Sequence, residues 1–496
     1  MNSKNILSTG SPAENLDPAN WDDLRQLGHR MVDDMVAFLS TIGEQPVWRK
    51  PSPEAKKLLN SAVPESPRDL EDVYADFKEH VLPYYTGNIH PRFWGWVMGS
   101  GTLQSALADM LAATMNPNVA LGDQGAMYVD KQVIDWCKEM MGYPAGAGGA
   151  LVSGASMANL TALLVARNAF DEKIRREGLQ DRSHKMIVYA SSEAHSCIPR
   201  AVEMLGLGTD NLHSIQVDTG YAMNVDHLRS RIAADEAAGL QPFCVVATAG
   251  TVNTGAIDPL EEITLLCREK GLWLHVDGAF GALAGLLPEQ APALGLIAEA
   301  DSVAFDLHKW MYLPYGVGCV LVRDGDVHRR AFQYSADYLM QHERGISAGL
   351  ESTSNFGLEL SRDFKALKVW MSVQEHGLDK FRRLIRRNIR QAAYLAQRIE
   401  QIPKLELMAP VPLNIVCFRY NPGWLNAAEL NALNKEILMQ LQESGIAAPS
   451  YTRLQQSYCL RVAICNHRTT DADLETLIEA VLKIGAQAMR FEAVPG

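Results

Sequence analysis

The sequence predicts an α/β fold built on a mostly parallel sheet, followed by a smaller α+β region. From about residue 103, short apolar runs alternate with segments whose apolar residues recur at helical spacing. Strands separated by helices pair in parallel, so this alternation indicates a sheet with helices on both faces. After about residue 377 the pattern changes to a long helix, two strands and a last helix. We therefore expect an N-terminal helical segment (1–102), a large domain (103–376) and a small C-terminal domain (377–496).

The N-terminal segment contains one strongly patterned helix. Asn20 can cap it, and the apolar positions between residues 21 and 39 follow helical spacing until Gly43. The following proline-rich stretch, residues 48–67, is predicted to be a linker rather than an element.

The two later regions supply the predicted sheet strands and the cap. The long helix of the small domain places apolar residues on one face from Phe381 to Ile399. The large-domain strands are expected at residues 185–189, 244–247, 272–276, 303–305 and 317–322. The small-domain strands are expected at residues 415–418 and 459–463.

The composition is that of an ordinary globular protein. The chain has 496 residues, 47% hydrophobic and 21% charged, with a formal net charge of -12. This negative charge argues against nucleic acid or anionic lipid as partners. No run of ~20 apolar residues is present for a membrane helix, and the first eight residues lack the apolar core of a signal peptide.

The eight cysteines are dispersed and form no CxxC pair. Several lie in apolar strands, so we expect buried free thiols and a cytoplasmic location.

Two predicted strands bring a carboxylate and a lysine toward one edge of the sheet. One strand ends at Asp277, and the next leads into His308-Lys309-Trp310. Ligands of open α/β sheets sit beyond the carboxyl ends of the strands. Pyridoxal-phosphate chemistry needs a lysine amine for the aldehyde and a carboxylate at the pyridine nitrogen. An exposed loop pair and a helix cap explain either segment alone, but not the two together.

A glycine-rich stretch lies upstream of these strands. Residues 146–149 lead to Ser153-Gly154-Ala155-Ser156 and then to a helix from Met157. Small residues let backbone amides approach a phosphate, and a helix N-terminus adds partial positive charge. The G-x-G-x-x-G fingerprint of nicotinamide sites is missing. A phosphate site is therefore predicted, with a simple N-cap serine as the alternative.

These segments resemble group II pyridoxal-phosphate-dependent decarboxylases of the aromatic-L-amino-acid decarboxylase type. The similarity runs from His90 through Ser156 and residues 192–196 to Lys309 and Arg461, and so covers most of the chain. The resemblance implies a fold-type-I transferase with a seven-stranded, mostly parallel sheet. It also implies a homodimer in which the N-terminal segment wraps the partner subunit, with a helix that covers its own domain as the alternative.

The resemblance assigns roles to individual residues. It implies that Lys309 carries pyridoxal 5'-phosphate, that Asp277 faces the ring nitrogen, and that His195 stacks on the ring beside the substrate carboxylate. Ala279 matches the small residue on the opposite ring face. The other implied cofactor contacts are Ala155, Ser156, Thr251 and His308. His308 has a helix-cap contact as its alternative, and no metal ligand is expected.

The expected reaction is decarboxylation of an L-amino acid, most simply an aromatic one, to the amine and carbon dioxide. An aldehyde synthase and a decarboxylase of acidic amino acids such as glutamate or aspartate stay open. A non-catalytic relative is also conceivable, but intact Lys309, Asp277 and His195 argue against it.

One departure from the family pattern concerns the proton donor to Cα. Thr353 stands where a loop tyrosine is common, and Tyr334, Tyr338 and His342 are the candidate replacements.

Other departures concern the cofactor side. Val252 and Asp306 stand where a threonine and an asparagine are common, and Asp306 is expected to point away from the phosphate or to bond His308. Arg461 is expected either to hold an anionic group or to form an ion pair. The aromatic stretch at residues 93–97 is expected to line a pocket or to belong to the core.

Overall fold

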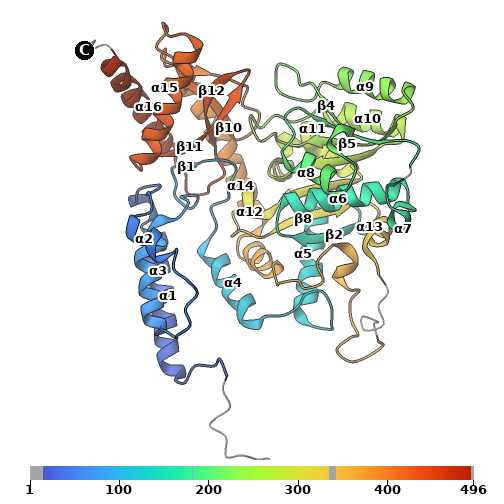
Figure 1. The fold of residues 1–496 in the computed structure, drawn as a ribbon, viewed down its shortest axis with the longest axis horizontal. Coiled ribbons are helices and arrows are strands. Elements are labelled where there is room, and N and C mark those ends of the chain that lie inside the picture. Colours follow the sequence, from blue (N-terminus) through green and yellow to red (C-terminus); the bar gives the residue numbers. More distant parts are fainter. Residues whose placement is uncertain (1–14, 181, 335–341, 493–496) are drawn as a thin grey trace, which may run out of the picture. The chain divides into compact units, whose positions relative to one another are not determined.

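The computed structural model describes residues 15–180, 182–334 and 342–492. The chain divides into two compact units. The smaller unit comprises the described residues up to Gln45 together with Pro51–Tyr85, and the larger unit comprises Pro46–Lys50 and the chain from Thr86 onward. Figure 1 shows the elements of both units.

The smaller unit contains three helices, α1 (Trp21–Ser40), α2 (Pro53–Leu58) and α3 (Leu70–His80). The Asn20 side chain accepts a hydrogen bond from the second residue of α1, which confirms the predicted cap. Helix α2 corrects the prediction of a linker. Ser52 caps α2 through the amide of Ala55, and Pro53 occupies the first helical position, where its missing N–H costs nothing.

A seven-stranded sheet forms the centre of the larger unit, in the order β2-β8-β7-β6-β5-β3-β4. Strand β8 runs antiparallel to its two neighbours, and the other pairs are parallel. The predicted sheet, and the five strands predicted in it, are confirmed. The strands are β2 (Gly148–Val152), β3 (Met186–Ser191), β4 (Leu212–Ile215), β5 (Gln241–Thr248), β6 (Trp273–Asp277), β7 (Ser302–Asp306) and β8 (Gly318–Val322).

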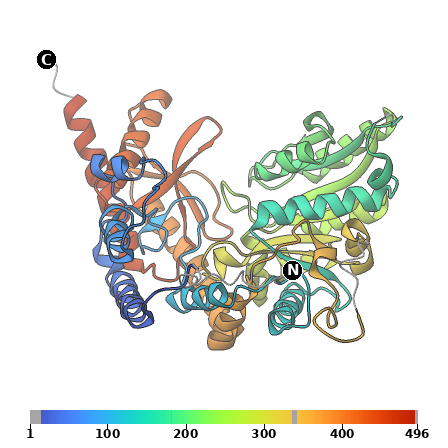
Figure 2. The same cartoon turned by 60° about the horizontal axis from the view of Figure 1, so that its bottom comes forward.

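Helices cover both faces of this sheet because its strands are apolar on both sides. On β5, Cys244 and Val246 pack with α6 (Ala155–Phe170) and α8 (Cys197–Met204). Val245 and Ala247 of β5 pack on the other face. The helices of that face are α5 (Gly125–Met141), α9 (Val225–Ala237) and α10 (Leu260–Lys270). Figures 1 and 2 show α6 lying along the sheet.

The C-terminal part of the larger unit begins within α14 (Ala366–Glu400). Gly377 interrupts that helix with φ 64°, close to the predicted start of the small domain. A five-stranded sheet follows, in the order β1-β11-β12-β10-β9, with β1 paired in parallel to β11. Its strands are β1 (Phe93–Trp94), β9 (Leu405–Leu407), β10 (Ile415–Tyr420), β11 (Ala448–Leu454) and β12 (Ser457–Ala463). Helices α15 (Ala427–Glu443) and α16 (Asp471–Glu492) complete this part.

Among the described residues, five further α-helices belong to the larger unit. They are α4 (Leu103–Met115), α7 (Ile174–Glu177), α11 (Ala291–Leu294), α12 (Leu307–Trp310) and α13 (Gly325–Phe332). All eight cysteines are buried and unpaired, as predicted. Within the described ranges, no helix has the length and apolar character needed to cross a membrane.

Candidate active site

The carboxyl ends of β6 and β7 lie side by side and border a cavity of about 430 Å³. Strand β6 ends at Asp277, and the one-turn helix α12 after β7 carries Lys309. The cavity is also lined by residues of the α6 N-terminus and of the segment after β3. It thus brings together seven of the predicted residues, Ala155, Ser156, His195, Asp277, Ala279, His308 and Lys309.

Asp277 is buried at the base of this cavity, with 2% of its surface exposed. Its Oδ1 accepts the amide of Ala279 at 3.1 Å, and Asn159 also donates to the carboxyl group. Burial raises the pKa of Asp277, while the charge of Lys309 opposes the rise. A buried carboxyl group of this kind gains from a cationic partner, and a protonated ring nitrogen would be one.

Lys309 and the α6 N-terminus are joined by Asp306. The Lys309 Nζ lies 3.0 Å from Asp306 Oδ2, and the amide of Ala155 donates to Asp306 Oδ1 at 2.7 Å. The sequence predicted that Asp306 points away from the phosphate or bonds His308. Its carboxylate instead contacts Lys309 and the α6 N-terminus, where the phosphate is expected. Its Oδ1 is 3.7 Å from His308 Nδ1, which instead donates to the carbonyl of Val317 at 2.9 Å.

The position of one proton on His195 follows from its backbone contact. The amide of Cys197 donates to His195 Nδ1 at 3.2 Å, so the neutral ring carries its proton on Nε2. The ring is exposed at the cavity, yet the surrounding protein desolvates it enough to lower its pKa. His195 is therefore neutral near pH 7 and offers an N–H group on its Nε2 side.

Two residues named from the sequence lie elsewhere: Thr251 is the one predicted site residue outside the lining, and Thr353 is the position where a tyrosine is common in the family. Thr251 is fully buried outside the cavity lining, and its hydroxyl lies 3.0 Å from that of Thr254 and accepts the amide of Ala256. Thr353 also lies away from the lining, because its hydroxyl donates to the carbonyl of Val119 at 2.7 Å.

Of the candidate proton donors, the described residues Tyr334 and His342 do not line this cavity. Tyr334 is 78% exposed, and the guanidinium of Arg175 lies 4.7 Å from the centre of its ring. Tyr338 falls outside the described residues, and His342 is exposed.

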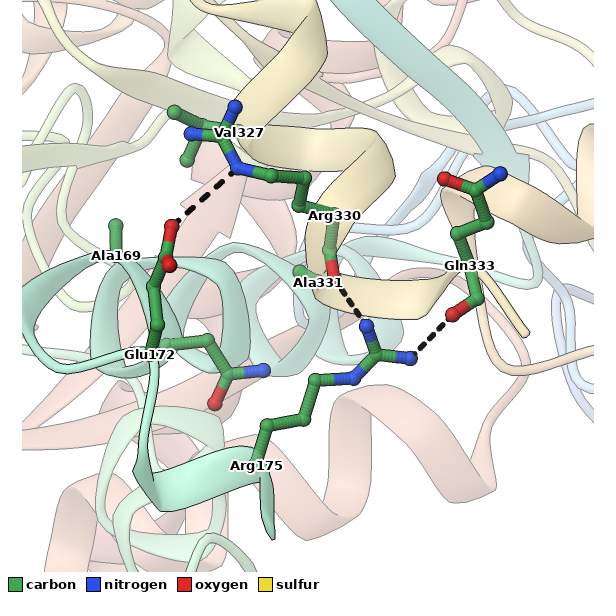
Figure 3. Close-up of a pocket in the computed structure, with 8 residues that line it drawn as sticks. Ala169, Glu172, Arg175, Val327, Arg330, Ala331 and Gln333 are labelled. Carbon is green, nitrogen blue, oxygen red and sulfur yellow. Dashed lines mark hydrogen bonds and ion pairs between the residues drawn. The ribbon is translucent and has the colours of Figure 1, made fainter. Parts of the chain in front are cut away.

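A second cavity, of about 460 Å³, lies beside Tyr334 between α6, α7 and α13 (Figure 3). Arg175 donates to the carbonyls of Arg330 and Gln333, and Arg330 lies 3.4 Å from Glu172. None of the predicted site residues lines this second cavity. Among the described residues, no group of three or more His, Cys, Asp or Glu side chains is placed to hold a metal ion.

Sequence reasoning missed one residue that lines the first cavity, Thr248, and one that contacts its lining residues, Asn159. Thr248 pairs with Asp277 in the β5–β6 register, and its buried hydroxyl has no hydrogen-bond partner among the described residues. Asn159 is buried beneath the cavity and contacts Asp277, Cys197 and His275. The position of Thr248 at a strand end, one strand from Asp277, was the available signal. Asn159 gave none, because it lies inside a helix.

These residues fit pyridoxal phosphate. Lys309 would supply the amine, and Asp277 would supply a buried carboxyl group for the ring nitrogen. At the α6 N-terminus the amide of Ala155 is already bonded to Asp306, so Ser156 would be the residue there that is left for the phosphate. Gly318 packs closely beside the α6 N-terminus. A Cβ atom added at Gly318 would lie 2.7 Å from both Asp306 Oδ1 and the Gly154 Cα, so a larger residue there would displace these groups.

Comparison with known proteins agrees with this fit. Residues 52–421 match the model of the pyridoxal-dependent decarboxylase conserved domain. An aromatic-L-amino-acid decarboxylase of Bacillus atrophaeus is 34% identical, covering 94% of this chain and 96% of the relative. A phenylacetaldehyde synthase of Arabidopsis thaliana is 29% identical, covering 90% of this chain and 93% of the relative.

A likeness in fold extends to solved structures. Tryptophan decarboxylase of Catharanthus roseus, solved with L-tryptophan, has a TM-score of 0.85 at 24% identity and covers 95% of this chain and 100% of its own. The family match and the Bacillus relative each extend over most of the chain. The chain therefore belongs to the pyridoxal-dependent decarboxylase family, whose cofactor is pyridoxal phosphate.

Proposed function

We propose that this chain removes the carboxylate of an aromatic L-amino acid and releases the amine and carbon dioxide. The observation that carries the proposal is the meeting of Lys309, Asp277 and His195 at one cavity. When bound, pyridoxal phosphate supplies the electron sink that lets the bond between Cα and the carboxylate break. The protein must bind and orient the substrate and manage the protons.

Each of the three residues has a part in this proposal. Lys309 would hold the cofactor through its side-chain amine. Asp277 would hold a proton on the ring nitrogen, since a buried carboxylate favours a neighbouring positive charge. His195 offers its Nε2 proton from the cavity side, as its Nδ1 is occupied by the Cys197 amide.

The cavity wall favours an uncharged, apolar substrate side chain. Trp96, Val97 and Phe280 contribute apolar surface. No arginine is among the described residues that line the cavity, and its lysine is committed to the cofactor. A second carboxylate on the substrate would meet Asp306 and Asp277 without a free cation, and so glutamate and aspartate are disfavoured.

Release of carbon dioxide from a panel of the twenty amino acids tests the substrate class. The purified holoenzyme is expected to act on tyrosine, tryptophan or phenylalanine and to leave glutamate and aspartate unchanged. Lys309→Ala, handled identically, gives the background rate. Turnover of glutamate or aspartate above that background, with none for the aromatic amino acids, would overturn the proposal.

An aldehyde synthase is the second candidate, and Thr353 favours it. A threonine cannot replace a phenol as a proton donor, and its hydroxyl is already bonded to Val119. Slow protonation of Cα would leave the reaction open to oxygen. Products formed under air, with a peroxide assay alongside, separate the two outcomes. Amine without peroxide supports decarboxylation, whereas stoichiometric peroxide and ammonia with an aldehyde would replace it.

We also infer that the active form is a homodimer clasped by α1, in a reducing cytoplasm. Helix α1 carries Trp21, Leu24 and Val36 at 65%, 37% and 43% exposure, an apolar surface that is costly to leave in water. Buried, unpaired cysteines agree with a reducing compartment.

Sedimentation of the intact chain is expected to give two subunits. Deletion of residues 1–45 should weaken the dimer, and a stable, active dimer after that deletion would show that α1 is not a clasp.

A further inference from the structure

Arg461 lies in the middle of β12 and is buried, with 3% of its surface exposed. Its side chain reaches from the C-terminal sheet to two segments of the cavity wall. The Nη1 group donates to the carbonyl of Trp96 at 2.9 Å, and Nη2 donates to the carbonyl of Val252. Trp96 and Val252 both line the cavity.

The remaining contacts use up most of the donors of this guanidinium. Nε donates to the carbonyl of Asn253 at 3.1 Å, and Nη1 also donates to the Ser450 hydroxyl at 3.1 Å. A guanidinium has five N–H donors in a fixed planar fork, and four of them are therefore engaged. All four acceptors are neutral. Both expectations for Arg461, an anion ligand or an ion pair, thus differ from its contacts.

The network continues to the segment that carries His195. The Asn253 side chain donates to Glu193 Oε2 at 2.8 Å, two residues before His195, and accepts the Thr452 hydroxyl at 2.7 Å. Arg461 therefore ties the chain after β1 to the turn after β5 and, through Asn253, to the segment after β3.

Trp96 needs such support. Its φ of 51° lies in the left-handed region, where a bulky residue is strained. The bond from Arg461 is made to the carbonyl of this residue.

We propose that Arg461 is a positioning residue that fixes the substrate side of the cavity through the backbone of Trp96 and Val252, and that it does not bind a substrate carboxylate. The inference rests on the proposed function and deepens it. Because backbone carbonyls already hold the guanidinium of Arg461, it offers no cation to a second carboxylate on the substrate. Dicarboxylic amino acids are therefore disfavoured.

Arg461→Lys tests the proposal, because a lysine keeps the charge but cannot span three carbonyls. For the best aromatic substrate KM should rise about tenfold. A change of this size corresponds to the loss of roughly one hydrogen bond to a charged group. The Ki of the corresponding amine, which lacks the carboxylate, should rise by the same factor. The cofactor Kd should stay unchanged, because Arg461 contacts none of the proposed cofactor residues.

The matched control is Arg419→Lys. Arg419 lies in β10 of the same sheet, is bonded to Glu406 at 2.7 Å and does not line the cavity. KM and Ki should both be unchanged in this variant.

Two results would overturn the proposal. A rise in KM with an unchanged Ki for the amine would mean that Arg461 binds the substrate carboxylate, and unchanged values of both would mean that it positions nothing. If Arg461→Lys does not fold, Ser450→Ala removes one neutral acceptor and should raise KM and Ki together by about two- to threefold; no rise in either would contradict the proposal. Failure of the proposed function itself would appear earlier, as wild-type enzyme inactive on every aromatic amino acid.

Discussion

The cavity at the sheet edge and the cavity beside Arg175 have nearly equal volumes, about 430 and about 460 Å³, but different parts of the fold build them. The first lies at the carboxyl ends of β6 and β7, where Asp277 and Asp306 are 2% exposed. The second lies between helix surfaces, where Arg175 donates to carbonyls and Arg330 faces Glu172 (Figure 3).

The two cavities differ in the burial of charged groups and not in volume, so burial of charge is the property that identifies the site. Desolvation of a titratable group costs free energy unless a partner compensates it. At the sheet edge the strands hold carboxyl groups in that costly state, next to Lys309. Beside Arg175 the charges are solvated and already paired, so they offer little to a ligand.

Replacement of the lysine should give the largest effect. Lys309→Ala is expected to lower kcat by about 10⁴-fold or more, because it removes the nucleophile that carries the cofactor. Arg175→Ala at the other cavity should change kcat by about twofold or less, as surface substitutions do. Steady-state decarboxylation assays measure both. Comparable losses in the two variants would mean that the cavities are not functionally distinct.

Asp277→Asn should follow, with a kcat lower by about 10²–10³-fold, since the ring nitrogen loses its charged partner. Some cofactor should stay bound, and its visible absorbance reports this independently of turnover. The matched change at the second cavity, Glu172→Gln, should alter neither quantity. Full activity of Asp277→Asn would contradict the role given to this carboxyl group.

His195→Gln should cost less, about 10²-fold in kcat, the lower end of what proton transfer by a positioned side chain contributes. Glutamine keeps an N–H donor but cannot give up a proton. If protonation at Cα is the step affected, the fraction of aldehyde and peroxide formed under air should rise in this variant. An unchanged kcat and product ratio would move the donor elsewhere, with Tyr338 and His342 next to substitute.

The smallest expected effect is a fall in the free energy of unfolding at low pH. It arises from one buried histidine in β6 and one in α13. Burial lowers the pKa of His275, next to Asp277 in β6, to about 3 and that of His328 in α13 to about 4. Below pH 6.5 the unfolded chain binds protons that the folded chain does not, so the free energy of unfolding falls as pH falls. The full stability should be present only well above pH 6.5. Between pH 7 and pH 5 each histidine should account for a loss of ~2 kcal/mol in the free energy of unfolding.

Urea unfolding at pH 7 and pH 5 measures this loss, with His328→Gln as the comparison. The variant should lose about half of the pH dependence contributed by the pair. A free energy of unfolding that does not change between these pH values would contradict the prediction.

The sheet and the centre of the site could be predicted because their signals are local. Apolar runs mark β3, β5, β6, β7 and β8. Asp277 ends β6 and Lys309 follows β7, and because these two strands are parallel neighbours, both residues reach the same edge of the sheet. Helix α2 was missed because its signal is only a serine cap before a proline.

Long-range contacts decided the rest. Strand β1 pairs with β11 more than 350 residues later, and no local pattern in a two-residue strand announces that partner. The partners of Arg461 lie in segments near residues 96 and 253, so a sequence alone cannot tell a carbonyl clamp from an anion site. The family resemblance implied that Thr251 contacts the cofactor, but its hydroxyl lies 3.0 Å from that of Thr254.

The central claim is that Lys309 carries the cofactor at the sheet-edge cavity. Borohydride reduction of the holoenzyme, followed by proteolysis and mass spectrometry, fixes the cofactor on the lysine that holds it. We predict a pyridoxyl mass on the peptide containing Lys309, and none in Lys309→Ala. A label on another lysine of the wild-type chain, or no label at all, would contradict the account.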